Sequence, residues 1–256
     1  MGTIITNYIH PKNTAGRISY ALGRGIGAHM VKGAIYCPGP WAGFPYPPLQ
    51  GVFQRVRTSG YDWWYADHCY LDREKHYRIT RNAYQVSTLP DDGYHLSAEN
   101  VARFATLNIK IQPWRRGGRY ILLCPPDIDR HCNFVFGFSR GWWIATVLEK
   151  LRKYTDREII MRDYTTETPL YDQLDDAHIL VTAYSNVAVD ALIYGVPVCC
   201  THPCGAMPLA TRINDIETPV YADNRYELFL HLCANQWTLN EIERGEVKRI
   251  FDDGRS

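Results

Sequence analysis

Short apolar runs of strand length alternate with helical patterns along most of the 256 residues. This alternation is typical of parallel sheets, because the helix that joins two parallel strands covers one face of the sheet. The sequence therefore predicts an α/β fold that closes in helices at its C-terminus. In the first half we expect a helix at 13–27 and strands at 3–8, 32–37, 61–66 and 77–80. In the second half we expect strands at 120–124, 158–162, 178–182 and 196–200, and helices at 142–154, 169–174 and 186–194.

A Pro- and Gly-containing stretch at 112–118 interrupts the pattern and predicts a domain boundary. We expect one domain at residues 1–112 and a second at 119–256. The formal net charge of +1 hides an asymmetry: residues 1–120 hold 15 Lys and Arg against 7 Asp and Glu, whereas residues 121–256 hold 13 against 20. The basic half suits a polyanionic partner, although two lobes of opposite charge could also simply attract each other.

Composition excludes several classes of protein. The longest apolar runs, such as residues 179–183, are far shorter than the roughly 18 residues that a membrane-spanning helix needs. The first residues lack the pattern of a signal peptide, so we expect a cytoplasmic protein with reduced cysteines. The motif at Cys199, Cys200, His202 and Cys204 lacks a second Cys/His pair at zinc-site spacing, and no metal is expected there.

The most informative stretch, residues 178–198, has the form strand, polar turn, helix, glycine, proline, strand. Ser185 and Asn186 fall where the chain enters the helix, so they can cap it while its N-terminal dipole faces an anion such as a diphosphate. Asp190 follows one turn later, within reach of a ribose diol. Gly195 and Pro197 then end the helix and start the next strand.

This segment resembles the nucleotide-sugar-binding domain of glycosyltransferases with the GT-B fold. That superfamily marks its donor site with small polar residues, an acidic residue, four further residues and then Gly-x-Pro, a pattern that Asp190, Gly195 and Pro197 match. The family more often has glutamate at the acidic position. An α/β protein without such a site can also place a capped helix before Gly-x-Pro.

The resemblance implies two Rossmann-like domains that face a cleft, and a nucleoside diphosphate sugar as donor, with no tightly bound cofactor. It implies that Asp190 holds the ribose, that Arg162 faces the phosphates, and that His202 and Gly205 contact the sugar or phosphate. Ser185 and Asn186 would lie at the diphosphate.

In the basic half, Asp67 and His68 directly follow an apolar run, where a side chain at a strand end could deprotonate an acceptor hydroxyl. Asp67 is the first choice, and a purely structural role for the pair is the alternative. Arginines and rings interleave around it, a mixture that suits either a nucleic acid or a sugar. The candidate acceptor-binding residues are Arg55, Arg57, Trp64, Arg78 and Arg81.

The leading hypothesis is a glycosyltransferase that acts on a hydroxyl, with a hydroxymethylated base in DNA favoured as acceptor. Phage enzymes of this kind fit the architecture, in which case the protein would work in the host cytoplasm. The alternatives are a transferase that acts on a cell-surface polysaccharide, and a nucleotide- or nucleic-acid-binding module without turnover.

Overall fold

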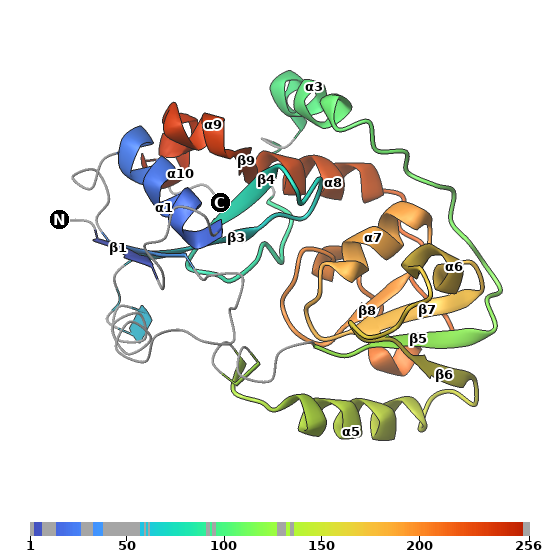
Figure 1. The fold of residues 1–256 in the computed structure, drawn as a ribbon. Coiled ribbons are helices and arrows are strands. Elements are labelled where there is room, and N and C mark those ends of the chain that lie inside the picture. Colours follow the sequence, from blue (N-terminus) through green and yellow to red (C-terminus); the bar gives the residue numbers. More distant parts are fainter. Residues whose placement is uncertain are drawn as a thin grey trace. The chain divides into compact units, whose positions relative to one another are not determined.

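The computed structural model describes residues 3–6, 14–26, 33–37, 57–58, 60, 62–90, 93, 96–126, 132–133 and 136–252 (Figure 1). The chain divides into two compact units. Unit 1 combines Met1–Val86 with Asn235–Ser256, and unit 2 is Ser87–Ala234. The α/β class predicted from the sequence is confirmed in that both units combine a sheet with helices.

Unit 1 is built on a mixed sheet of five strands in the order β1-β2-β3-β4-β9. The first three strands are parallel, whereas β4 runs antiparallel to both β3 and β9. The strands are β1 (Thr3–Thr6), β2 (Gly33–Cys37), β3 (Asp62–His68), β4 (His76–Arg81) and β9 (Gln236–Thr238). Among the strands that the structure describes in unit 1 this order does not reverse to form the switch point of a Rossmann-like domain, and a pair of such domains is not confirmed.

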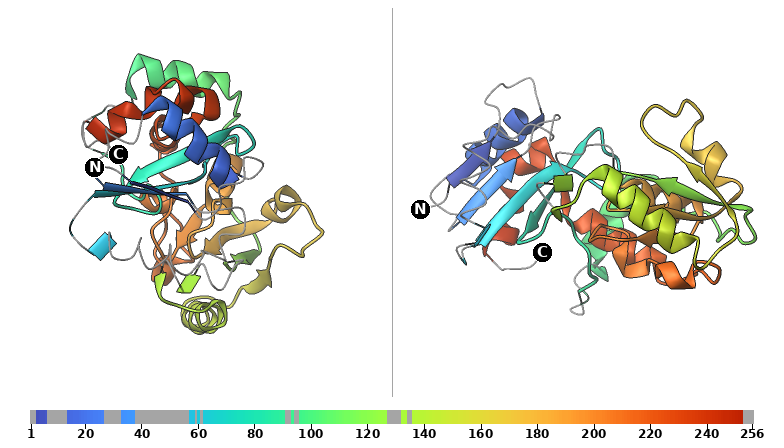
Figure 2. Two further views of the ribbon diagram at one scale, coloured as in Figure 1. Left: turned by 60° about the vertical axis from the view of Figure 1, so that its left-hand side comes forward. Right: turned by 90° about the horizontal axis from the view of Figure 1, so that it is seen from below.

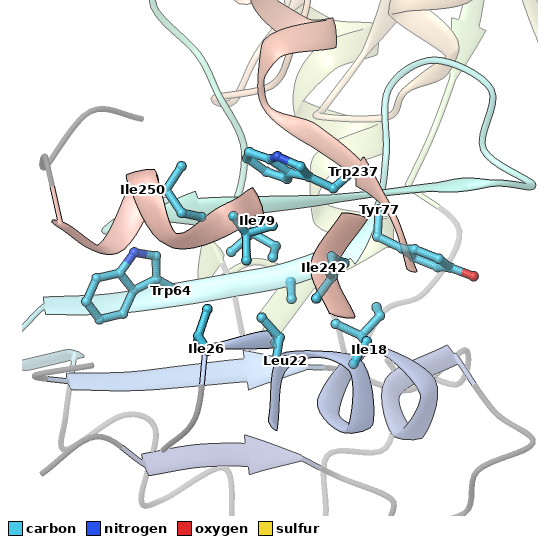
Figure 3. Packing of buried hydrophobic residues seen from close by; sticks show 12 residues of the cluster. Ile18, Leu22, Ile26, Trp64, Tyr77, Ile79, Trp237, Ile242 and Ile250 are labelled. Atoms are coloured by element: carbon cyan, nitrogen blue, oxygen red, sulfur yellow. The ribbon is translucent and has the colours of Figure 1, made fainter. Parts of the chain in front are cut away.

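The helices α1 (Thr14–Gly25), α9 (Leu239–Glu243) and α10 (Arg249–Asp252) cover one face of this sheet (Figure 1). Ile18 and Leu22 lie four residues apart on α1, so both face the sheet, where they meet Trp64 and Ile79 (Figure 3). Ile242 of α9 joins the same core. Residues from both ends of the chain therefore share one hydrophobic core.

Unit 2 is built on a fully parallel sheet in the order β6-β5-β7-β8. Its strands are β5 (Tyr120–Cys124), β6 (Glu158–Met161), β7 (Ala177–Thr182) and β8 (Val198–Cys200). The helix α5 (Arg140–Leu151) crosses one face of the sheet (Figure 2), and α6 (Leu170–Leu174) and α7 (Val187–Tyr194) lie on the other (Figure 1). Every residue of β7 is buried, as expected of a central strand that is covered on both faces.

Two more helices of unit 2 escaped the sequence analysis as separate elements. They are α3 (Ala98–Thr106) and α8 (Arg225–Ala234), which pack on each other through Phe104, Tyr226 and Phe229. Short 3-10 turns η2 (Met207–Leu209), η3 (Ile213–Asp215) and η4 (Glu246–Lys248) complete the described elements. Among the described helices, none is long and apolar enough to cross a membrane.

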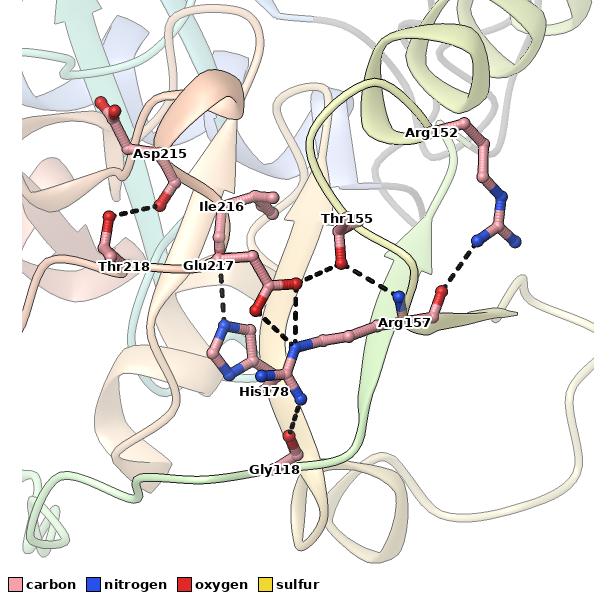
Figure 4. A network of polar contacts seen from close by, with 9 residues as sticks. All are labelled: Gly118, Arg152, Thr155, Arg157, His178, Asp215, Ile216, Glu217 and Thr218. Carbon is pink, nitrogen blue, oxygen red and sulfur yellow. Dashed lines mark hydrogen bonds and ion pairs between the residues drawn. The ribbon is translucent and has the colours of Figure 1, made fainter.

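A polar network closes unit 2 on the side of the sheet where β6 and β7 begin (Figure 4). Glu217 accepts hydrogen bonds from the Thr155 hydroxyl and from Nε of Arg157, while Nη1 of Arg157 donates to the Gly118 carbonyl at 2.7 Å. Nearby, Nε2 of His178 donates to the Ile216 carbonyl over 2.9 Å. Burial, followed by the nearby charge of Arg157, lowers the pKa of His178, so the ring is held neutral.

The predicted boundary at 112–119 differs from the observed division, because this stretch is bound firmly into unit 2. Its backbone bonds to the end of α7 and to the start of β7: Gln112 N donates to Ile193 O (2.8 Å), Arg115 N to Gly195 O (2.7 Å), and Arg119 N to Asp176 O (2.8 Å). The C-terminal residues from Asn235 onward belong to unit 1, because β9 pairs with β4 and α9 packs on α1. Both features depend on contacts between distant segments, which composition does not report.

Most predicted elements are present within a few residues of their expected bounds. Thr238-Leu-Asn-Glu241 has the sequence pattern of a capping box, and it forms one at the start of α9: Glu241 N donates to Oγ1 of Thr238, and the Glu241 carboxylate accepts from Thr238 N. The chain does close in helices, but β9 interrupts them.

Candidate functional site

The carboxyl ends of four parallel strands meet at one edge of the unit 2 sheet. The chain leaves β5 for β6 on one side and returns to β7 on the other, so the strand order reverses between β5 and β7. The connections diverge at such a point and leave a crevice where open α/β sheets bind ligands. Oγ1 of Thr182 donates to the Cys124 carbonyl at 2.8 Å and ties the two strand ends together below this crevice.

A cavity of about 160 Å³ lies at this edge. Its walls come from the ends of three strands and the start of α7, and we call it the switch-point cavity: Cys124, Pro125, Arg162, Asp163, Tyr164, Ser185 and Val187. Two of the predicted donor-binding residues, Arg162 and Ser185, are thus brought together although 23 positions separate them in the sequence.

Arg162 brings a cationic group to the cavity. Its backbone N donates to Leu123 O at 2.8 Å, which extends the ladder between β6 and β5 by one residue. Its Nη1 donates to two neutral oxygen atoms, Thr168 O and Oε1 of Gln173, both at 2.5 Å. These contacts orient the guanidinium, and it makes no ion pair with a carboxylate of the described residues. The positive charge is left available to an anion.

Ser185 caps the helix on the opposite wall. Its Oγ accepts from Val187 N at 3.3 Å, and its carbonyl accepts from Ala188 N, so the turn leads directly into α7. The first residues of a helix carry the positive end of its dipole. The cavity therefore combines a guanidinium with a helix N-terminus, two features that both favour an anion.

The other predicted residues of this segment lie beside the cavity rather than on its walls. Asn186 has helical backbone angles and its side chain makes no capping hydrogen bond, so the cap belongs to Ser185 alone. Asp190 sits in the first turn of α7 and is half-buried. Neither is among the residues that line the switch-point cavity.

Asp163 and Tyr164 line the cavity and were missed by the sequence analysis. Hydrogen bonds from the Thr165 side chain and backbone N lower the pKa of Asp163, which also faces Nη2 of Arg140 at 3.4 Å. Tyr164 is 76% exposed, which is unusual for so large a ring. Their position directly after a predicted strand was the signal that could have identified them.

A second, larger pocket of about 470 Å³ lies along α5. The far wall is formed by the end of β8 and the residues that follow it, through Asn214. It contains the predicted residue His202, which is thus separated from Arg162 and Ser185. The two pockets share no lining residue.

His202 is held by a chain of hydrogen bonds. Nε1 of Trp143 donates to Oγ1 of Thr201 at 2.7 Å, and this hydroxyl lies 2.9 Å from Nδ1 of His202. The ring also packs on Phe138, with centroids 4.4 Å apart. Burial, followed by the charge of Lys150, lowers the pKa of His202 and favours the neutral ring.

The loop after β8 is otherwise occupied by small or buried residues. Gly205 is buried and is not among the lining residues of either pocket. Cys199, Cys200 and Cys204 are buried free thiols. Burial raises the pKa of Cys199 to about 12, so this thiol stays protonated. Across the part of the chain that the structure describes, no cluster of three or more His, Cys, Asp or Glu could hold a metal ion.

In unit 1, the candidate base residues lie within β3, at its C-terminal end, rather than after it. Asp67 pairs across the sheet with Arg78 of β4, and its Oδ2 lies 3.3 Å from Nη2 of that arginine. His68 is exposed, and its ring lies 6.2 Å from that of Tyr77. Neighbouring residues of a strand point to opposite faces, so the two side chains do not form a pair.

The five predicted acceptor-binding residues have different environments. Trp64 is 2% exposed and belongs to the unit 1 core, and Arg78 is 4% exposed between His68, Tyr84 and Asp67. We therefore correct both assignments: the two side chains stabilise the interior of unit 1 and do not form an acceptor surface.

Arg57 and Arg81 lie nearer the surface. Nη1 of Arg57 donates to the hydroxyl of Tyr84 at 2.6 Å, and Nη2 of Arg81 lies 2.6 Å from Oδ2 of Asp62. Arg55 lies outside the described residues.

Comparison with known proteins adds no relative. No protein-family model matches the sequence, and no curated protein matches it either. The functional argument therefore rests on the geometry of the two units.

Proposed function

We propose that this protein is a transferase that moves a sugar from a nucleoside diphosphate sugar to a hydroxyl, and that unit 2 binds the donor. The observation that carries the proposal is the switch-point cavity, where Arg162 and the Ser185-capped start of α7 share one opening. A diphosphate is the chemical group that best satisfies a guanidinium and a helix N-terminus together.

The size of the cavity indicates which part of the donor it would hold. Its volume of about 160 Å³ is below the roughly 300 Å³ at which pockets for whole small molecules begin. The diphosphate would occupy the cavity, and the rest of the donor would extend past it. Tyr164 offers an exposed ring on that side, and Asp190 lies one turn into α7 as the candidate partner of the ribose.

The environment of the two candidate bases favours His68 over Asp67. Protonation of Asp67 would remove the partner of a buried guanidinium, which is costly in an apolar interior. His68 is exposed and makes no ion pair with the described residues that its protonation would break, so its imidazole is the better placed of the two to accept a proton from an acceptor hydroxyl. In this proposal Asp67 is a positioning residue that keeps Arg78 and the end of β3 in place.

The acceptor remains the hydroxymethylated base in DNA, with a cell-surface polysaccharide as the alternative. The charge asymmetry persists when it is counted by unit: unit 1 holds 14 Lys and Arg against 9 Asp and Glu, and unit 2 holds 14 against 18. A net charge of +5 on unit 1 favours a polyanion. The burial of Trp64 and Arg78 leaves fewer side chains for base recognition than the sequence predicted.

Donor binding is tested by thermal stabilisation with nucleoside diphosphates and their sugar esters, because a ligand that binds only the folded state raises its stability. Arg162→Gln is expected to weaken binding roughly 10- to 100-fold, the range for a lost charged hydrogen bond. The matched control is Arg152→Gln, since Arg152 is an exposed arginine of the same unit whose Nη1 donates to a carbonyl. Equal affinities in both variants would overturn the donor site.

Transfer is tested with the donor so identified and two acceptors, a duplex that contains hydroxymethylated cytosine and a polysaccharide. Release of the nucleoside diphosphate with only one acceptor names the substrate class. His68→Ala should abolish transfer while donor binding is kept. Donor binding without transfer to either acceptor would support the nucleotide-binding module instead.

A further inference from the structure

The larger pocket along α5 has a chemistry of its own. Its lining differs entirely from that of the switch-point cavity, and its volume of about 470 Å³ falls within the range of small-molecule sites. It is formed within unit 2 by Trp142, Trp143, Thr146, Val147, Lys150, Cys199, Cys200, Thr201, His202, Met207, Ala210, Thr211, Arg212, Ile213 and Asn214.

The helix α5 sets an aromatic ring and a charge at opposite ends of this pocket. Trp142, Thr146 and Lys150 follow each other at intervals of four residues, so they lie along one face of the helix. At a rise of 1.5 Å per residue, the Cα atoms of Trp142 and Lys150 are about 12 Å apart. A ligand that contacts both must carry a flat face at one end and an acidic group at the other.

The indole of Trp142 is available as a stacking surface. It is 58% exposed, although a tryptophan is normally well buried. Its position is supported from behind, because its ring lies 6.1 Å from that of Phe138, which in turn packs on His202. Its backbone N donates to the Ser139 side chain at 3.2 Å, which anchors the first turn of α5. An exposed but supported ring is suited to stack on a planar or saccharide ring.

The charges on the pocket walls are positive. Lys150 and Arg212 are both exposed, and neither makes an ion pair with any carboxylate that the structure describes. By contrast Lys153, two residues beyond the end of α5, is paired with Glu149 at 2.8 Å. An anionic ligand would supply the counter-charge that Lys150 and Arg212 lack.

His202 adds an oriented ring to the pocket wall. Its Nδ1 lies 2.9 Å from Oγ1 of Thr201, which itself accepts from Nε1 of Trp143, so this contact holds the imidazole in place. Nε2 is the ring nitrogen left for a polar atom of the ligand.

From the stacking surface of Trp142, the cations Lys150 and Arg212, and the oriented ring of His202, we infer that this pocket is a second binding site, which takes a phosphate ester of a ring compound. A nucleoside monophosphate and a sugar phosphate share this chemistry. The site does not depend on the proposed donor site, because the two pockets have no lining residue in common.

The test is calorimetric titration of the full chain with adenosine 5′-monophosphate, glucose 1-phosphate, adenosine and inorganic phosphate. We expect at least one phosphate ester to bind more tightly than adenosine and inorganic phosphate, because only an ester reaches both ends of the pocket. Tight binding of the nucleotide alone or of the sugar phosphate alone identifies the ring.

Two variants locate the bound ester. Trp142→Ala and Lys150→Gln are each expected to weaken binding about tenfold or more, since each removes one end of the contact. The matched control is Lys153→Gln, which removes a charge two residues beyond the end of α5 and outside the pocket lining, and which should bind normally. The circular dichroism of each variant reports its helix content and so checks that the variant is folded.

The inference fails if none of the four compounds binds. It also fails if binding is lost in Arg162→Gln and kept in Trp142→Ala, because the ester would then occupy the switch-point cavity. That second outcome would leave the proposed donor site intact, so the two proposals are distinguished by the same set of variants.

Discussion

Gly195 is the residue of the Asp190–Pro197 motif for which the structure supplies the most direct physical test. It ends α7 with φ of +85°, and a Cβ atom built on it would lie 2.0 Å from the carbonyl oxygen of Pro113. Atoms in real structures do not approach so closely, and the obstacle is backbone rather than a flexible side chain. Gly195→Ala must therefore displace the segment at 112–115.

The loss in free energy of unfolding can be worked out from the backbone conformation and from the hydrogen bonds that the displacement breaks. An alanine in the left-handed backbone region costs about 1 kcal/mol by itself. The hydrogen bonds from Gln112 N to Ile193 O and from Arg115 N to Gly195 O would be strained or lost, at about 1 kcal/mol each. We expect Gly195→Ala to lower the free energy of unfolding of unit 2 by about 3 kcal/mol.

Gly117→Ala is the matched control, because Gly117 has φ of +82° and no atom within 4 Å of its would-be Cβ. This variant carries the backbone cost of about 1 kcal/mol without the collision. Native-state hydrogen exchange of the β7 amides reports the stability of unit 2 separately from that of unit 1. We expect exchange to accelerate more than a hundredfold in Gly195→Ala and about fivefold in Gly117→Ala. Equal acceleration in the two variants would refute the reasoning.

Three further predictions concern stability. Burial lowers the pKa of His178, so the unfolded chain binds a proton more readily than the folded chain does. The free energy of unfolding should therefore fall as the pH drops below about 6.5. The difference between the urea midpoints at pH 7.5 and pH 5 should be smaller in His178→Gln than in the native chain. Thr238→Ala removes the hydroxyl that accepts from Glu241 N at the start of α9 and should cost about 1 kcal/mol in urea unfolding. Asp67→Asn leaves Arg78 buried without its carboxylate and should cost about 3 kcal/mol, of which the double variant with Arg78→Met should recover part; a larger loss in the double variant would contradict this.

The sequence predicted unit 2 better than unit 1 for a physical reason. In unit 2, each parallel strand is followed by a helix that is adjacent in the chain, so hydrophobic periodicity reports the packing partners. In unit 1, the strand Gln236–Thr238 has three residues, too few for any periodic pattern, and it exists because β4 offers an unpaired edge. That pairing joins positions more than 150 residues apart, and local propensity carries no information about it.

The residues of the candidate site were likewise predictable only where a local sequence pattern placed them. The motif that ends in Gly195 and Pro197 placed Ser185 at a helix start, and the end of β6 placed Arg162 at a strand end, both of which are local features. The same reasoning could not separate His202 from these two residues, because it treated all loops at one edge of the sheet as one site. Trp64 and Arg78 were misassigned because the residue type of a strand position does not show whether its side chain faces solvent or the core.

By itself, the sequence determined the α/β class, most of the strands and helices, the capping box at Thr238, and the position of Ser185 at the start of a helix. These follow from periodicity and backbone chemistry that act over a few residues. Only the tertiary structure decided that the chain's two ends share one sheet, that Asp67 is paired with Arg78, and that two separate pockets open in unit 2. Those outcomes depend on which distant surfaces meet, because burial and pairing are properties of the assembled fold and not of any segment within it.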